Sequence, residues 1–101
     1  MLLMYKAFNF MPKTWFAYTG NNVPSNFYVR TNYYSVTPTF PAGTGNGSRI
    51  NLILANGPDG NMHPTTISLN LQWYIDAGLS SNYAQPQSPY GIKKYVYLID
   101  P

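Results

Sequence analysis

Apolar and polar residues alternate with a period of two along much of this chain, most regularly between residues 66 and 76. One set of alternating positions is entirely apolar: Ile67, Leu69, Leu71, Trp73 and Ile75. In a β-strand, successive side chains point to opposite faces, so these five would share one side. The pattern therefore predicts a strand at 66–76 with one buried face.

Three further segments have strand character. Residues 49–55 carry apolar side chains at both alternating sets of positions, which is typical of a central strand. Residues 27–36 and 93–99 are rich in aromatic and β-branched side chains. Two weaker candidates for strands are residues 2–10 and 15–18.

Gly, Pro and Asn separate these segments and predict the connections. The stretches 19–24 and 56–61 have the composition of turns, and the stretches 38–48 and 84–91 that of longer loops. Residues 76–81 could form a single helical turn, and we expect nothing longer because nine prolines are spread through the chain.

About six strands without helices must bury their apolar faces against one another. The predicted fold is therefore all-β, a small antiparallel β-sandwich of jelly-roll or Greek-key type, with a small β-barrel as the alternative. The length of 101 residues predicts a single domain over 1–101.

Composition changes the picture chiefly through the scarcity of charge. Charged residues make up 9% of the chain, the acids number three, and the formal net charge is +3. Ordinary domains carry about 25% charged residues, and here Asn, Ser, Thr, Gln and Tyr stand in their place. Such a surface has little repulsion to keep copies of the chain apart. It suits contact with neighbouring subunits.

Groups that could perform catalysis are few. The chain has no Cys and no Glu, and its one histidine, His63, fits no catalytic triad pattern. Asp59 lies in a Gly-Pro-Asp-Gly turn, where we expect it to bond its own backbone. Asp59 and His63 are close enough along the chain for a metal site, but no established metal motif is present. We expect a non-enzymatic protein without metal or cofactor.

These features favour a structural subunit that contacts copies of itself and other structural subunits. Virion components such as phage capsid, penton, spike or tail proteins are the expected class, located in a virion or at an extracellular surface. The N-terminal apolar run is too short for a secretion signal, and no stretch is long enough to span a membrane. The candidate interface residues are Tyr28, Tyr33, Tyr34, Phe40, Tyr83 and Tyr90.

Two alternatives stay open. In a carbohydrate-binding or adhesin module, Trp15, Tyr18 and Tyr90 would form an aromatic platform among neutral amides. In a single-stranded nucleic-acid-binding β-barrel, Tyr and basic residues of the segments 28–34 and 93–97 would stack and pair with the ligand. The small net charge and the lack of a basic stripe argue against nucleic acid.

Overall fold

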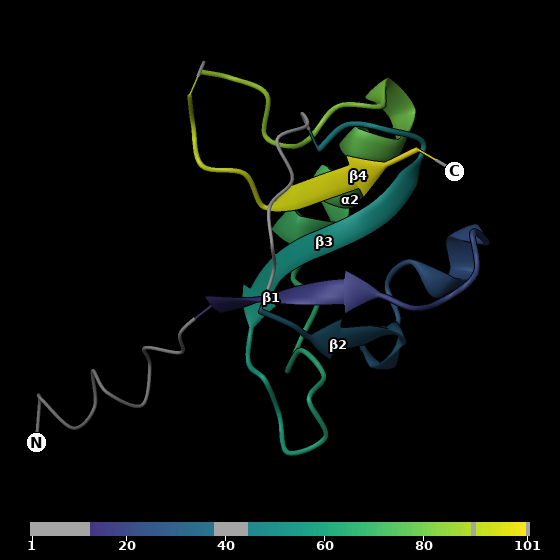
Figure 1. The fold of residues 1–101 in the computed structure, drawn as a ribbon, viewed down its shortest axis with the longest axis vertical. Coiled ribbons are helices and arrows are strands. Elements are labelled where there is room, and N and C mark those ends of the chain that lie inside the picture. Colours follow the sequence, from purple (N-terminus) through teal and green to yellow (C-terminus); the bar gives the residue numbers. More distant parts are fainter. Residues whose placement is uncertain (1–12, 38–44, 90, 101) are drawn as a thin grey trace, which may run out of the picture.

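Four strands form one antiparallel sheet in the computed structural model, which describes residues 13–37, 45–89 and 91–100. The strands are β1 (Lys13–Tyr18), β2 (Tyr33–Ser35), β3 (Arg49–Asn56) and β4 (Val96–Ile99). Their order across the sheet is β2-β1-β3-β4 (Figure 1). Two short 3-10 helices, η1 (Pro24–Asn26) and η2 (Arg30–Asn32), connect β1 to β2.

Strand β3 lies inside the sheet, as its two apolar faces predict. Ile53 and Ala55 point to one face and belong to the main hydrophobic core. Leu52 and Leu54 alternate with them and are also buried, on the other face. The prediction of a central strand at 49–55 is confirmed.

The predicted strand at 66–76 is wrong, because this segment contributes most of the helix α2 (Leu69–Ser81). The helix packs against β3 and β4 and lies behind the sheet in Figure 1. The alternating apolar positions divide into two rows with a spacing of four residues. Ile67, Leu71 and Ile75 are buried, whereas Leu69 and Trp73 are each 65% exposed. Two rows of opposite exposure are what a helix produces.

Local chemistry defines both ends of α2. The hydroxyl of Ser68 accepts the backbone N–H of Leu71 at 3.2 Å, which is a standard N-cap. Asn82 ends the helix in the left-handed conformation, with a φ of 67°. The expectation of at most one helical turn at 76–81 is therefore wrong. Prolines do not prevent this helix, because the nearest ones, Pro64 and Pro86, lie outside it.

The remaining predicted strands are confirmed in part. Segment 15–18 lies in β1 and segment 93–99 contains β4, whereas only the end of 27–36 is a strand, β2. The start of that segment turns through η2 instead. The candidate strand at 2–10 lies outside the described residues.

The fold is thus a small β-rich domain with an antiparallel sheet and a helix on one face. Its core holds Phe16, Tyr33, Ile53, Ile75 and Val96, all fully buried. The all-β prediction is too narrow, because α2 provides the second layer. Across the residues described, a single sheet is formed, and it gives no specific support to a sandwich, jelly roll or barrel.

Candidate functional site

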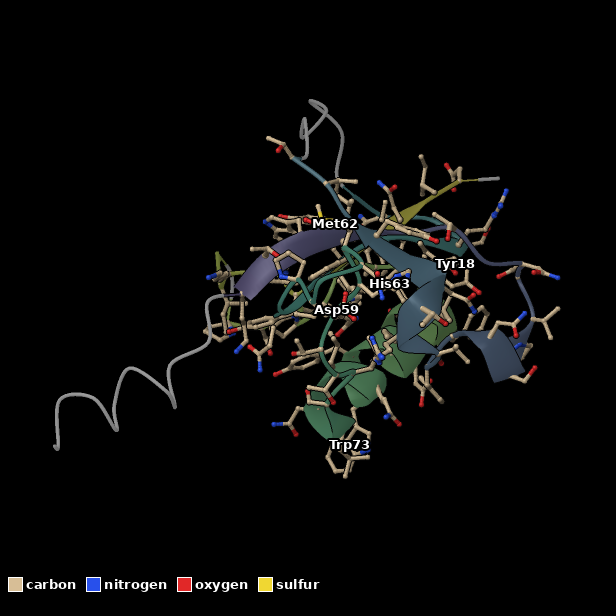
Figure 2. The ribbon with its side chains drawn as sticks, turned by 90° about the horizontal axis from the view of Figure 1, so that it is seen from below. Tyr18, Asp59, Met62, His63 and Trp73 are labelled. Carbon is tan, nitrogen blue, oxygen red and sulfur yellow. The ribbon has the colours of Figure 1, made fainter. Side chains whose placement is uncertain are left out.

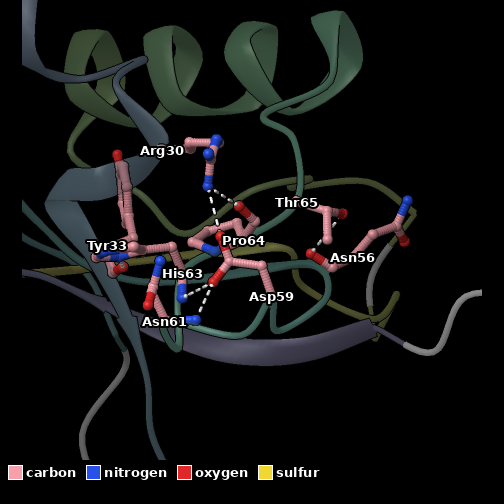
Figure 3. Close-up of polar contacts among 8 residues, drawn as sticks. All are labelled: Arg30, Tyr33, Asn56, Asp59, Asn61, His63, Pro64 and Thr65. Carbon is pink, nitrogen blue, oxygen red and sulfur yellow. Dashed lines mark hydrogen bonds and ion pairs between the residues drawn. The ribbon is translucent and has the colours of Figure 1, made fainter.

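Asp59 organises the loop between β3 and α2 (Figure 3). Its Oδ1 accepts the backbone N–H groups of Asn61 at 2.8 Å and His63 at 3.0 Å, and its Oδ2 forms an ion pair with Arg30 at 2.7 Å. The His63 N–H lowers the pKa of Asp59, with smaller contributions from Asn61 and Arg30. The expected structural role of Asp59 in its turn is confirmed.

His63 is held by the same loop. Its Nδ1 lies 2.8 Å from the carbonyl oxygen of Tyr33, so Nδ1 carries the proton and donates it. Its ring also contacts Tyr34, with 4.5 Å between the ring centroids. No group of three or more His, Cys, Asp or Glu side chains gathers in the described part of the chain. The contacts of Asp59 and His63 thus hold the loop in its conformation.

Both edges of the sheet are covered by other parts of the chain. At the β2 edge, the N–H of Ser35 donates to the carbonyl of Met62 at 2.7 Å. At the β4 edge, Val96 exchanges backbone hydrogen bonds with Gln85, and the N–H of Leu98 donates to Gly45 at 2.6 Å. An uncovered edge would offer these groups to a strand of another chain. The two edges are thus blocked against strand addition at these positions.

The six predicted interface residues fall into three groups. Tyr28, Tyr34 and Tyr83 are exposed. The prediction of Tyr33 as an interface residue is wrong, because its side chain is fully buried. The Tyr33 hydroxyl donates to the carbonyl of Phe27 at 2.7 Å. Burial raises the pKa of this hydroxyl. Phe40 and Tyr90 lie outside the described residues.

The structure does not bring the carbohydrate candidates together. Trp15 and Tyr18 are three residues apart on β1, so their side chains point to opposite faces of the sheet. Trp15 packs on Tyr97, with 5.3 Å between the ring centroids, whereas Tyr18 packs on Phe27 and Tyr33. The prediction that Trp15 and Tyr18 form a shared aromatic platform is wrong. Tyr90, the third candidate, is not among the described residues.

The groups expected to bind nucleic acid are also separated or engaged. The two predicted segments contribute β2 and β4, which are opposite edges of the sheet. Arg30 pairs with Asp59, and the Lys94 ammonium donates to the carbonyl of Pro86. These positions form no continuous surface of cations and rings.

The most conspicuous exposed feature is one that the sequence prediction placed in the core. We call Leu69 and Trp73 the helix row; they lie one turn apart on α2. Figure 2 shows Trp73 at the outer surface of α2, directed away from the sheet. Leu71 and Ile75 hold the opposite side of α2 in the core, so the helix row is fixed in position.

A tyrosine–carboxylate pair lies next to the helix row. The Tyr28 hydroxyl donates to the carboxylate of Asp76 on α2. This hydrogen bond, with some burial, raises the pKa of Tyr28 to about 12. The hydrogen bond connects the η1–η2 region to α2. It also engages the carboxylate of Asp76, the acidic residue on the exposed face of the helix.

In the described part of the chain, no helix has the length and hydropathy to cross a membrane. No protein-family model matches this sequence, and no curated protein and no solved structure is significantly similar to it.

Proposed function

We propose that this protein is a non-enzymatic assembly subunit whose copies associate through the exposed face of α2. The observation that carries the proposal is the helix row, an apolar pair that is 65% exposed at both residues on a rigidly held helix. Trp is enriched in the energetically dominant parts of protein interfaces. Asp59 and Asp76 are each occupied by hydrogen bonds within the chain, which also favours a role in contact over one in catalysis.

A second copy of the chain suits this face electrostatically. The exposed residues within α2 are Leu69, Asn70, Trp73, Asp76, Ala77 and Ser80. Asp76 is the single charged residue among them, and its carboxylate already accepts the Tyr28 hydroxyl. In a two-fold contact the same patch meets itself, so each charge on the patch risks meeting its equivalent. A nearly neutral patch avoids that repulsion.

The size of the helix row limits the strength of one contact. Burying a large apolar side chain contributes about 1.5–3 kcal/mol. Because 65% of each side chain is still exposed, the four side chains of a symmetric pair contribute roughly 4–8 kcal/mol, against an association cost of about 4–15 kcal/mol. A single contact is therefore weak. Stable association follows when each copy makes several contacts at once, as in a larger particle.

The covered sheet edges support contact through side chains. Because Met62, Gln85 and Gly45 already bind outward-facing backbone groups of β2 and β4, strand addition would first have to displace them. Contact through exposed side chains requires no such rearrangement.

Within this class, a virion component such as a phage capsid, penton, spike or tail protein is the specific form we propose. Its location would be the virion or an extracellular surface, and its partners would be copies of itself and other structural subunits. The low charge and the neutral amide-rich surface support this form. The proposal does not depend on a jelly roll. Detection of the chain in purified particles by mass spectrometry would test it.

Sedimentation-velocity measurements over a range of concentrations test the contact itself. We expect a reversible monomer–oligomer equilibrium that the double variant Leu69→Gln/Trp73→Gln shifts at least tenfold toward monomer, a factor corresponding to about 1.4 kcal/mol. The matched control is Met62→Gln. Met62 is 51% exposed and lies far from Trp73 in Figure 2. A monomer at every concentration, or equal weakening by the control, would refute the proposal.

A further inference from the structure

A cavity of about 280 Å³ lies where α2 begins, beside the end of β3 and the start of β1. Buried apolar groups of Leu54, Ala55 and Leu71 contribute to its lining. Tyr74 and Tyr95 also line it, and their rings stack with 5.8 Å between centroids and 30° between planes. The volume lies just below the range of about 300–1,000 Å³ for ligand sites, so only a small ligand would fit.

Polar groups of several elements converge on the same cavity. Lys13 and Asn56 are paired across β1 and β3, and the Lys13 ammonium lies 3.4 Å from Asn56 Oδ1. Asn70 in the first turn of α2 and Thr66 before it add an amide and a hydroxyl. Among the described residues that line the cavity, Lys13 carries a charge and no residue is acidic.

We propose that this cavity binds a monosaccharide that carries a carboxylate, in the class of the uronic acids. Aromatic rings offer a sugar ring an apolar surface, and the tyrosine hydroxyls remain able to bond its oxygens. Planar amides both donate and accept, which matches neighbouring sugar hydroxyls. The Lys13 ammonium, without an acid beside it in the lining, selects a ligand with one negative charge.

Each part of this ligand corresponds to a different part of the lining. A simple carboxylate such as acetate would pair with Lys13 but leave Tyr74 and Tyr95 uncovered. A neutral sugar would meet the rings and amides but leave the Lys13 charge unpaired. The combination of ring pair, amides and a single cation therefore favours the sugar acid over either fragment. The helix row is not part of the lining, but Asn70 belongs both to the lining and to the exposed face of α2, so the titration below is made at concentrations where the chain is monomeric.

Two-dimensional ¹H–¹⁵N NMR titration of the full chain tests the site with glucuronate and galacturonate as probes. We expect saturable shifts of the amides of Ala55, Asn70 and Leu71. We expect binding by glucose and by acetate to be at least tenfold weaker. Equal binding of glucose and glucuronate, shifts spread over the whole spectrum, or no saturable shift with either uronate would overturn the proposal.

Two lysine variants separate a specific ion pair from general attraction. Lys13→Gln and Lys93→Gln each remove one positive charge, and Lys93 is exposed and outside the lining. We expect Lys13→Gln to weaken uronate binding about tenfold, as for the loss of one charge-assisted hydrogen bond, and Lys93→Gln to change it less than twofold. Equal effects would contradict the site. Asn70→Ala, at an exposed helix position, provides a second test whose spectrum also reports whether the variant is folded.

Discussion

Replacing Ile75 and Trp73 separately by alanine distinguishes the helix from the strand that the alternation pattern indicates. In a strand, the two side chains would share one buried face, and both replacements would be costly. In the structure, Ile75 is fully buried and Trp73 is 65% exposed. In the helix, the two replacements should therefore lower the free energy of unfolding by different amounts.

The expected cost of Ile75→Ala follows from its burial. The change removes three carbon atoms from the core, worth about 0.8 kcal/mol each by transfer, or roughly 2.4 kcal/mol. The residual cavity adds to this cost, whereas the better helix propensity of alanine offsets roughly 0.5 kcal/mol. We expect a net loss of about 2–4 kcal/mol in the free energy of unfolding. Trp73→Ala should change that free energy by about 0.5 kcal/mol or less, because its side chain is largely in solvent.

Urea unfolding followed by far-UV circular dichroism measures both values, at concentrations where the chain is monomeric. With an m-value of about 1–1.5 kcal/mol/M for a chain of this size, Ile75→Ala should lower the midpoint by roughly 1.3–4 M. Trp73→Ala should move it by less than about 0.5 M. Similar losses in the two variants would refute the helical assignment of this segment.

Three further outcomes are expected. Tyr33→Phe should cost about 1–2 kcal/mol, because it removes the hydroxyl that donates to the buried Phe27 carbonyl; an unchanged urea midpoint would contradict this. Gly78→Ala should stabilise the protein by about 0.5–1 kcal/mol, since a Cβ there meets its nearest neighbours at 3.4–3.5 Å; a lower melting temperature would contradict it. Asp59 has a pKa below its unfolded value of 3.8, so its stabilising contribution is present above that pH and is lost as the pH falls through the folded pKa. Urea midpoints measured from neutral pH to about pH 3 should fall less steeply in Asp59→Asn than in the native protein.

The sheet is the part of the fold that could be predicted best. Strand β3 is apolar at both sets of alternating positions, which is the pattern of a strand buried on both faces. Segments 15–18 and 93–99 overlap β1 and β4 for the same local reason. The order of the strands depends on pairings between distant residues, such as Trp15 with Leu54, which local patterns do not encode.

The sequence pattern predicts a strand instead of the helix α2, because apolar residues that recur every second position also recur every fourth position. Ile67, Leu71 and Ile75 satisfy both periods, and the segment alone leaves the choice open. Two signals favoured the helix. Ser68 is a good N-cap, and the row continues past residue 76 to the half-buried Leu79, where the strand pattern has stopped.

The same ambiguity explains what was missed at the candidate site. A strand places Leu69 and Trp73 in the core with Leu71, so the pattern gave no reason to regard them as surface residues. Asp59 could be predicted because its backbone contacts lie two and four residues away. Its partner Arg30 is 29 residues away, and the burial of Tyr33 depends on tertiary packing.

The helix and the covered edges together constrain how copies of this chain can associate. Strand addition propagates easily, because each added chain presents a new open edge. Contact through one helix face behaves differently, since a symmetric pair uses the patch on both copies and closes. Leu69 and Trp73 would then be covered on both copies, which leaves neither side chain exposed to bind a third chain. Growth beyond the dimer therefore requires a second, chemically different contact on another face of each copy.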